Sequence, residues 1–280
     1  MIGIVILNYN SYDLTLKLVE NLENKIGIEK IVIVDNNSTN DSVNYLKSVK
    51  NKKVILIENK ENRGYSSGNN IGIKYLIKNF EDIKYIGILN PDIEIKGKNT
   101  FIKLIERLEE DNKIGIISPL MLMNGKLDKK LISWKLPQKF DNIFNCLGIT
   151  KKIKDILNLK KEKEVIPGSF LFFSKETIQK INYLDEGTFL YYEENILAQK
   201  LNQIGKVMKV ISNIEYNHVH SVERNNIKRK IFHNKIYFNS MIYYEENYNG
   251  KYSRINIPII KVLYYFRILE IFIKNLLMKG

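Results

Sequence analysis

Two apolar runs that end in polar residues decide the fold: IGIVILNYN over residues 2–10 and IVIVDNNS over residues 31–38. Short, β-branched apolar runs of this kind predict buried strands. Between them, Leu14, Leu18 and Leu22 recur every four residues, which predicts an amphipathic helix. A strand, a helix and a second strand at this spacing predict a βαβ unit.

The same alternation continues to about residue 120. A helix is expected after Ser38 or Thr39, either of which is a suitable N-cap. Further strands are expected over residues 54–57, 85–89 and 114–118, and helices over residues 66–80 and 101–110. This repetition predicts an α/β fold built on parallel strands.

Beyond residue 120 the alternation is weaker. One strand is expected over residues 165–173, interrupted by Pro167-Gly168-Ser169, and another over residues 206–211. Helices are expected over residues 193–204, 227–248 and 259–278.

Polar residues gather where three of the expected strands end. They are Asn8–Asn10, Asp35–Ser38 and Asn90–Asp92. Ligands of parallel α/β sheets bind beyond the carboxyl ends of the strands. Strand ends are polar turns in any case, but three ends rich in Asp and Asn favour a nucleotide site in this half of the chain.

Two carboxylate groups are candidates for chemistry. Asp92 and Glu94 follow a strand, where oxygen ligands suit a hard divalent cation on a diphosphate, although exposed turn carboxylates are common. Glu193 and Glu194 follow an aromatic run and begin a helix. A carboxylate beside bulky aromatic residues is partly desolvated and suits a general base. The helix dipole alone would also favour the pair at that position.

The stretch NRGYSSGNN over residues 62–70 places glycines and a cation before a helix, where the backbone can approach a phosphate or a ribose. It lacks the Gly-Lys-Ser/Thr of a Walker motif, and no Gly-x-Gly-x-x-Gly follows the first strand. His218 and His220 are expected to share one face of a strand, where a pair of this kind is more often structural than a metal ligand.

The net charge of +13 attracts the chain to nucleic acid, nucleotide phosphates or an anionic membrane face, although a coding bias towards Lys, Ile and Asn would give the same excess. The single Cys146 excludes an internal disulfide and fits a reducing cytoplasm. No apolar run reaches the roughly 18 residues of a transmembrane helix. Residues 1–10 lack the basic start of a signal peptide, so a cytoplasmic location is expected.

Six segments together resemble family 2 glycosyltransferases of the GT-A fold, in particular their rhamnosyltransferase-like and capsular-polysaccharide branch. In chain order they are residues 5–10, residues 33–38 with Asp41, residues 62–72, residues 89–92, residues 168–171 and residues 189–194. The resemblance implies an α/β fold with a Rossmann-like mixed sheet and a C-terminal helical extension. Residues 1–221 would form the catalytic domain, with a nucleotide-binding half over about 1–118 and an acceptor half over 119–221. Residues 222–280 would form a helical tail.

The resemblance also implies a role for each matching residue. The donor nucleotide sugar would be bound by Asn8, Asn10, Asp35, Asn37, Arg63, Gly64, Asn70, Asn90 and Asp92. Asp92, with His218 or His220, would hold Mn²⁺ or Mg²⁺ on the diphosphate. Gly168 and Ser169 would lie on the acceptor side, and Glu194, preceded by Glu193, would be the catalytic base.

The sequence departs from the family pattern at three positions. Asn90 replaces the first acid of the metal motif, Glu194 stands where many relatives have Asp, and Ile196 stands where many have a further acid. The implied mechanism is a direct displacement with inversion. Glu194 takes the proton of an acceptor hydroxyl, which attacks the anomeric carbon of a UDP- or dTDP-sugar.

The resemblance implies a glycan or lipid-linked saccharide acceptor and a role in assembling cell-surface polysaccharide, with no nucleic-acid partner. The tail over residues 257–278 is apolar with a narrow polar stripe of Arg267, Glu270 and Lys274, and a basic cluster lies upstream at residues 224–230. Such a helix suits the inner membrane face. It would equally suit packing on the catalytic domain or on a second subunit.

Three other functions remain open. A nucleotidyltransferase that makes nucleotide sugars would carry a Gly-rich loop after the first strand, and Asn8–Ser11 contains no glycine. A basic nucleic-acid binder would interleave cations with exposed aromatic residues, whereas the strand ends here carry Asp and Asn. An inactive relative acting as a scaffold would bind the donor without turnover.

Overall fold

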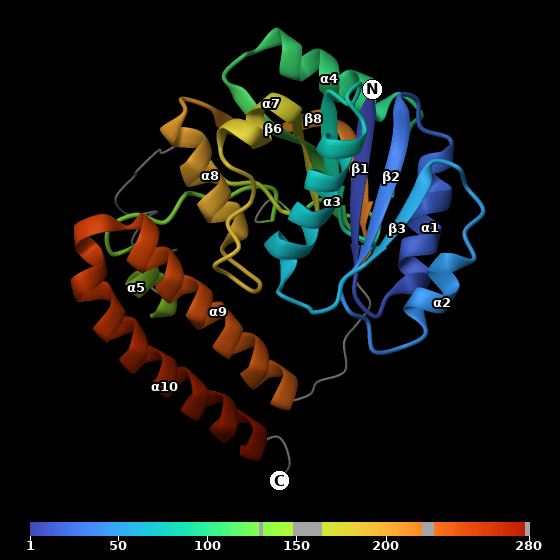
Figure 1. The fold of residues 1–280 in the computed structure, drawn as a ribbon. Helices are drawn as coiled ribbons and strands as arrows, with labels where there is room; N and C mark the ends of the chain where they lie inside the picture. The colour runs from blue at the N-terminus through green and yellow to red at the C-terminus, as the bar shows by residue number, and fades with distance from the viewer. Residues whose placement is uncertain (129–130, 148–163, 220–226, 278–280) are drawn as a thin grey trace.

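A computed structural model describes residues 1–128, 131–147, 164–219 and 227–277. This part of the chain forms a mixed eight-stranded sheet with helices on both faces (Figure 1). The strand order is β3-β2-β1-β4-β7-β6-β8-β5. The strands are β1 (Ile2–Asn8), β2 (Ile28–Asp35), β3 (Val54–Glu58), β4 (Tyr85–Leu89), β5 (Ile93–Ile95), β6 (Ile114–Met123), β7 (Phe170–Ser174) and β8 (Val207–His218).

Half of the sheet is parallel, as the alternation predicts. Strands β3, β2, β1 and β4 all run in one direction, and the β1–β2 register sets Asn8 opposite Asp35. Two strands for which no parallel direction was predicted run the other way: β7 is antiparallel to β4 and β6, and β5 is antiparallel to β8. The sheet is therefore mixed, as the family resemblance implies.

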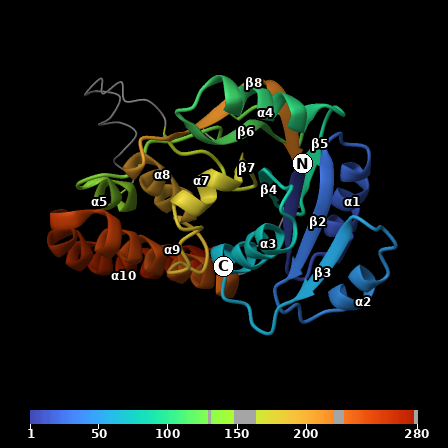
Figure 2. The same cartoon turned by 45° about the horizontal axis from the view of Figure 1, so that its top comes forward.

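Helices cover both faces of the sheet (Figures 1 and 2). On one face lie α1 (Tyr12–Glu23), α2 (Ser42–Lys47) and α4 (Thr100–Glu110), which bury residues such as Leu18, Leu46 and Phe101 against the sheet. On the other face lie α3 (Tyr65–Asn79), α7 (Lys175–Lys180) and α8 (Glu193–Gln203). Burial of these two apolar layers is the main favourable contribution to folding.

The C-terminal helices extend the second of these faces. Helices α9 (Ile227–Tyr248) and α10 (Ser253–Leu277) are joined by a short 3-10 helix, η1 (Gly250–Tyr252), and pack on each other and on α5 (Asp141–Cys146). Met241 and Tyr244 of α9 and Ile260 of α10 are buried in the same cluster as the α3 and α8 side of the sheet. The two helices are thus part of the core, and the expected boundary after residue 221 falls outside the described residues.

Three local expectations are corrected. Ser38 and Thr39 do not cap a helix, because α2 begins at Ser42 and their hydroxyls bond to Asp35 and Asn10 instead. The strand expected over 165–173 begins only at Phe170, since Pro167 has no backbone N–H for a ladder bond. Helix α10 begins six residues earlier than expected and contains Pro258.

Candidate active site

The carboxyl ends of β1 and β2 are joined side chain to side chain. Asn8 Nδ2 donates hydrogen bonds to Asp35 Oδ1 (2.7 Å) and Ser38 Oγ (3.2 Å), and the Ser38 backbone N–H donates to Asp35 Oδ2 (2.9 Å). Thr15 of α1 donates to Asn8 Oδ1 (2.8 Å). Asn8 and Asp35 are fully buried. The pairing follows from the register, and it makes a rigid polar platform at the end of the sheet where ligands bind.

The loops that follow these two strands are fastened to each other by Asn10. Its side-chain oxygen accepts from the backbone N–H groups of Thr39 (2.8 Å) and Asn40 (3.3 Å). Asn10 and Asn37 both have left-handed backbones, with φ of 56° and 63°, which Asn tolerates better than most residues. This conformation leaves Asn37 exposed at the rim.

Asn36 lies in the expected Asp35–Ser38 cluster but was given no role of its own, and it connects the β2 end to the glycine-containing loop. It is buried, donates to Asn62 Oδ1 (2.9 Å) and accepts from Asn59 Nδ2 (3.0 Å). Its neighbour Asn37 is the residue to which the family resemblance gives a role. The only signal for Asn36 is its place in the Asp-Asn-Asn-Ser run.

The loop around Gly64 contacts the segment before α8. Gly64 has φ of 97°, and a Cβ there would lie 2.1 Å from the Phe189 carbonyl oxygen, so only glycine fits. That same oxygen accepts from the Tyr65 N–H (2.9 Å). Arg63 is exposed and lies 3.6 Å from the Glu61 carboxylate.

Asn70 supports a loop in this structure. It is buried, its Nδ2 donates to the Leu184 carbonyl (2.9 Å) and Glu186 Oε1 (2.8 Å), and its Oδ1 accepts from the Leu184 N–H (3.1 Å). The side chain thereby ties α3 to the segment that leads to α8. Its expected place on the nucleotide side stays a prediction.

Asp92 and His218 face each other across the β5–β8 edge. Asp92 precedes Ile93, which pairs with His218, and Asp92 Oδ1 lies 3.0 Å from His218 Nε2. The two side chains are 25% and 12% exposed, and the buried Asp92 Oδ1 makes no hydrogen bond. Two ligands at right angles around a cation with bonds near 2.1 Å are about 3 Å apart, so the pair fits a shared divalent cation. His220 lies outside the described residues.

These two residues do not complete a metal shell alone. Within the residues that the structure describes, no group of three or more His, Cys, Asp and Glu side chains is arranged to hold a metal ion. Mg²⁺-type sites in which one or two protein ligands are completed by substrate phosphates and water are common. The donor set therefore suits a cation that arrives with a phosphate ligand.

Glu193 and Glu194 begin α8 directly after a strained turn. Tyr191 and Tyr192 both have left-handed backbones, with φ of 73° and 69°, which costs about 1–3 kcal/mol each. Side-chain bonds hold the turn: Tyr192 Oη donates to Asn142 Oδ1 (2.8 Å), and Tyr191 Oη lies 2.8 Å from His233 Nδ1. Strain of this kind is typical of functional sites, and this turn leads directly into the two carboxylates.

The two carboxylates are partly buried and their pKa values are raised. Burial raises the pKa of Glu194, and burial together with the charge of Glu194 raises the pKa of Glu193 further. Glu194 Oε1 accepts from the Gly168 N–H (3.2 Å), whereas Glu193 Oε2 is buried without a hydrogen bond. Burial and the two nearby carboxylates also raise the pKa of the Tyr65 phenol. A carboxylate of raised pKa is a better proton acceptor.

Gly168 and Ser169 connect the parts of the site. Tyr65 Oη donates to the Gly168 carbonyl (2.7 Å), and the Asn90 N–H donates to the Ser169 carbonyl (2.9 Å). The Ser169 hydroxyl is buried against Tyr216 Oη, 2.7 Å away. Tyr216, which sequence analysis did not single out, thus links Ser169 to the strand that carries His218.

These contacts form one continuous chain of hydrogen bonds along the sheet edge, which is the end of the sheet where strands β1, β2 and β4 finish. It runs from the Asn8–Asp35 platform through Asn36 and the Gly64 loop, and from Tyr65 to Gly168 and Glu194. A branch passes from Ser169 to Asn90 and so to Asp92. The structure therefore brings the expected donor, metal and base residues to one edge, while Asn70 and Arg63 serve or border the surrounding loops.

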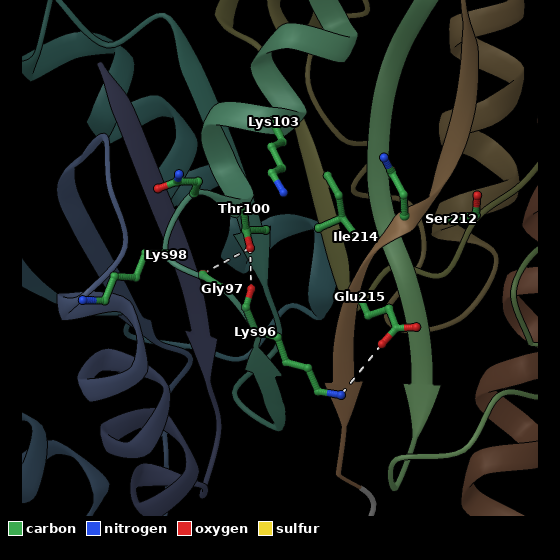
Figure 3. Close-up of a pocket in the computed structure, with 10 residues that line it drawn as sticks. Lys96, Gly97, Lys98, Thr100, Lys103, Ser212, Ile214 and Glu215 are labelled. Atoms are coloured by element: carbon green, nitrogen blue, oxygen red, sulfur yellow. Dashed lines mark hydrogen bonds and ion pairs between the residues drawn. The ribbon is translucent and has the colours of Figure 1, made fainter.

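One cavity borders the sheet edge, and another lies away from the expected site residues. A cavity of about 510 Å³ borders Asp92 and is also lined by Leu14, Lys17, Pro91 and Val219. A cavity of about 580 Å³ lies beyond the C-terminal end of β5 and beside the middle of β8, between Lys96, Thr100 and Lys103 on one side and Ile214 and Glu215 on the other (Figure 3). None of the expected site residues lines the second cavity.

Curated relatives match most of the chain. The hexosyltransferase Agl10 of low-salt glycan biosynthesis in Haloferax volcanii is 27% identical over 194 residues, which are 69% of this chain and 59% of Agl10. The chain thus spans about three fifths of the length of Agl10. Rhamnosyltransferase WbbL of Escherichia coli K12 is 28% identical over 215 residues, 73% of this chain and 78% of WbbL.

Solved structures share the fold at low identity. Mannosyltransferase PcManGT from Pyrobaculum calidifontis, in complex with GDP-Man and Mn²⁺, matches with a TM-score of 0.59 at 13% identity over 95% of this chain and 68% of its own. GalNAc-T7 with UDP, GalNAc and Mn²⁺ matches with a TM-score of 0.59 at 14% identity over 94% of this chain and 55% of its own. The expected GT-A fold is confirmed.

The sequence model for "Glycosyl transferase family 2" matches residues 3–181, which is more than half of the chain. The fold, the contact chain at the sheet edge and this match agree, and the protein belongs to glycosyl transferase family 2.

Proposed function

We propose that the protein transfers a sugar from a nucleotide-diphosphate sugar, of the UDP or dTDP class, to a hydroxyl group of a glycan, with inversion at the anomeric carbon. The observation that carries this proposal is the chain of contacts that gathers Asp35, Asp92 and Glu194 at one sheet edge. It agrees with the names of the relatives, which are a hexosyltransferase and a rhamnosyltransferase.

The donor would lie on the platform of Asn8 and Asp35. Their side chains are buried and bond to each other and to Ser38, so they would hold the end of the sheet in shape beneath the nucleotide. Asn10, Asn37, Arg63 and Gly64 surround this platform, and Asn90 leads to the diphosphate end. Preorganised polar groups reduce the entropy that binding costs.

Asp92 Oδ1 and His218 Nε2 would hold a divalent cation, Mn²⁺ or Mg²⁺, between them. A bound cation would offset the charge that develops on the departing nucleoside diphosphate. Two structural neighbours are complexes that contain Mn²⁺, which supports this assignment.

Glu194 would take the proton of the acceptor hydroxyl. The oxygen then forms a bond to the anomeric carbon, and the electron pair of the breaking bond leaves with the nucleoside diphosphate. The raised pKa of Glu194 suits proton uptake, and the Gly168 N–H orients its carboxylate. Glu193 lies beside it, and burial together with the charge of Glu194 raises the pKa of Glu193 well above its usual value.

The acceptor is proposed to be a lipid-linked saccharide at the inner face of the cell membrane, in the assembly of a cell-surface polysaccharide. Agl10 is a hexosyltransferase of low-salt glycan biosynthesis, which supports a glycan product. No helix within the described residues is both long and apolar enough to cross a bilayer.

The test is a thermal-shift panel of UDP-, dTDP- and GDP-sugars, each with and without Mn²⁺. A ligand at a hundred times its dissociation constant stabilises the fold by about 2.7 kcal/mol. We expect one nucleotide class to raise the melting temperature with Mn²⁺, and Asp92→Ala to remove this shift. Asp82→Ala, an exposed carboxylate in a turn, is the control and should keep it. Absence of any shift in the wild type would overturn the donor site.

A further inference from the structure

The outer face of α10 is apolar and exposed. Its side chains recur every three or four residues, and their exposure ranges from 39% to 64%; they are Ile255, Ile259, Val262, Phe266, Leu269 and Ile273. Spacing of this kind places them along one side of the helix. The opposite side packs inward, where Asn256 and Ile260 are fully buried. Figure 1 shows α10 at the outer margin of the molecule, with α9 beside it.

Cations border this apolar face, which is called here the α10 face. Arg254 and Lys261 are exposed on the helix itself. Arg267 and Lys274 lie near its C-terminal end, where Glu270 pairs with both. Helix α10 thus carries four Lys and Arg residues against one Glu.

The neighbouring helix adds to the same positive field. Because α9 and α10 pack on each other and are joined by the short η1 segment, the beginning of α9 lies beside the end of α10 (Figure 1). The beginning of α9 carries exposed Lys228, Arg229, Lys230 and Lys235. An apolar stripe bordered by cations is complementary to a surface that is apolar beneath and anionic above.

We propose that the α10 face binds an anionic phospholipid bilayer, with the helix lying in the plane of the interface. Its apolar side chains enter the boundary between headgroups and acyl chains, and its cations meet lipid phosphates. A second copy of the chain is a poorer occupant. An isologous contact through this face would bring two sets of like charges together.

Helix α9, which packs on α10, contacts the turn before the candidate base. Tyr191 Oη lies 2.8 Å from His233 Nδ1 of α9, and the Ser240 hydroxyl of α9 donates to the Leu190 carbonyl (2.8 Å). Both contacts hold the strained turn that precedes Glu193 and Glu194. Docking of α10 therefore also fixes the height of these carboxylates above the bilayer. This second step rests on the proposed function, whereas bilayer binding itself does not.

The experiment measures co-sedimentation of the full chain with vesicles. We expect binding to mixed phosphatidylcholine–phosphatidylglycerol vesicles and much weaker binding to pure phosphatidylcholine vesicles. The double variant Phe266→Glu, Leu269→Glu should lose at least about tenfold in vesicle affinity, since two apolar anchors become charged. The control pair Ile26→Glu, Leu127→Glu changes two apolar residues elsewhere that are about half exposed, and it should bind like the wild type.

Charge is tested separately with Arg254→Gln and Lys261→Gln. Each should weaken binding to the anionic vesicles by about fivefold, and added salt should remove the difference. Equal binding by the wild type and by the Phe266→Glu, Leu269→Glu variant would overturn the proposal. So would a wild-type dimer that this variant dissociates while neither form binds vesicles, because the face would then belong to a second copy.

The donor thermal shift, measured without lipid, keeps the two proposals apart. An α10 variant that loses vesicle binding but keeps its shift with the nucleotide sugar supports the α10 face on its own. A wild type that binds vesicles but no nucleotide sugar leaves the α10 face standing and overturns only the proposed function.

Discussion

The hydroxyl of Tyr65 donates a 2.7 Å hydrogen bond to the carbonyl oxygen of Gly168. Tyr65 begins the helix that follows the donor loop, and the N–H of the same Gly168 donates to Glu194. One peptide segment therefore connects the donor loop with the candidate base. A change on either side of Gly168 is expected to reach the other.

Gly168→Ala should lower kcat. A Cβ at this position would lie 2.9 Å from Glu194 Oε1, so the carboxylate has to move. A misplacement of about 1 Å can cost roughly a hundredfold in rate, so the smaller shift needed here should lower kcat by less than that. Steady-state kinetics with a saturating donor would measure the loss. Gly125→Ala is the control, because a Cβ there meets nothing within 4 Å, and only its φ of 77° makes it strained. An unchanged kcat in Gly168→Ala would contradict the role of Glu194.

Glu193→Gln should stabilise the fold at neutral pH. The folded pKa of Glu193 is raised by burial and by Glu194, so its contribution to stability is fully present below the unfolded pKa of about 4.3. It is lost as the pH rises through the folded pKa. Gln at this position stays neutral, so the variant keeps the stability that the wild type loses as Glu193 ionises. Melting temperatures measured across pH should show an advantage for the variant that disappears in acid.

The activity is expected to fall at acidic pH, because Glu194 is then protonated and cannot act as a base. Glu194 must be deprotonated to act as a base, and burial raises its pKa. We expect kcat to rise with pH through a value above the ordinary range of a Glu carboxyl. Tyr65→Phe removes a nearby ionisable group but keeps the carboxylates, and it should leave this limb in place. A limb at an ordinary Glu pKa would contradict a buried base.

His218→Gln should raise the Mn²⁺ concentration needed for half-maximal activity. His218 Nε2 and Asp92 Oδ1 are 3.0 Å apart and are proposed to share one cation. Loss of an outer-shell partner already costs about 10–100-fold in metal affinity, so loss of a ligand should cost at least about tenfold. Mn²⁺ titration of donor binding would measure this without turnover. An unchanged titration would assign the cation to other ligands.

The parallel half of the sheet was predictable because each of its strands is a compact apolar run that ends in polar residues. The Asn8–Asp35 pair follows from that prediction through register alone. Strand β5 was missed, since three residues are too few to show alternation. Asn36 is buried and Asn37 is exposed because the backbone of Asn37 is left-handed. Two adjacent Asn residues give no sign of which one will adopt that conformation.

The C-terminal helices show a second limit of prediction from the sequence. Their apolar character was evident, yet their contribution to the core and to the turn before Glu193 depends on contacts far apart in the sequence. Glu245 illustrates this, because a Glu within a helical stretch is ordinarily expected on the surface. In the structure its side chain is completely buried.

Three amide groups contact the Glu245 carboxylate, and none of them carries a charge. Asn142 Nδ2 donates to Oε1 (2.7 Å), and Asn249 and Asn256 donate to Oε2 (2.7 and 2.8 Å). Asn142 in turn accepts from Tyr192, the residue that precedes Glu193. Glu245→Gln would turn an amide N–H₂ towards these donors. We expect a loss of about 1–3 kcal/mol in unfolding free energy, measured by urea denaturation.

Glu246→Gln is the matched control, since its side chain is the exposed neighbour on the same helix and should change stability little. Tyr192→Phe separates positioning from stability. It removes only the hydroxyl that reaches Asn142, at a cost of about 1 kcal/mol. If the network aims the catalytic turn, Tyr192→Phe lowers kcat more than it raises KM. A variant with wild-type kcat and only reduced stability would show that the buried carboxylate holds the helices together without guiding the turn.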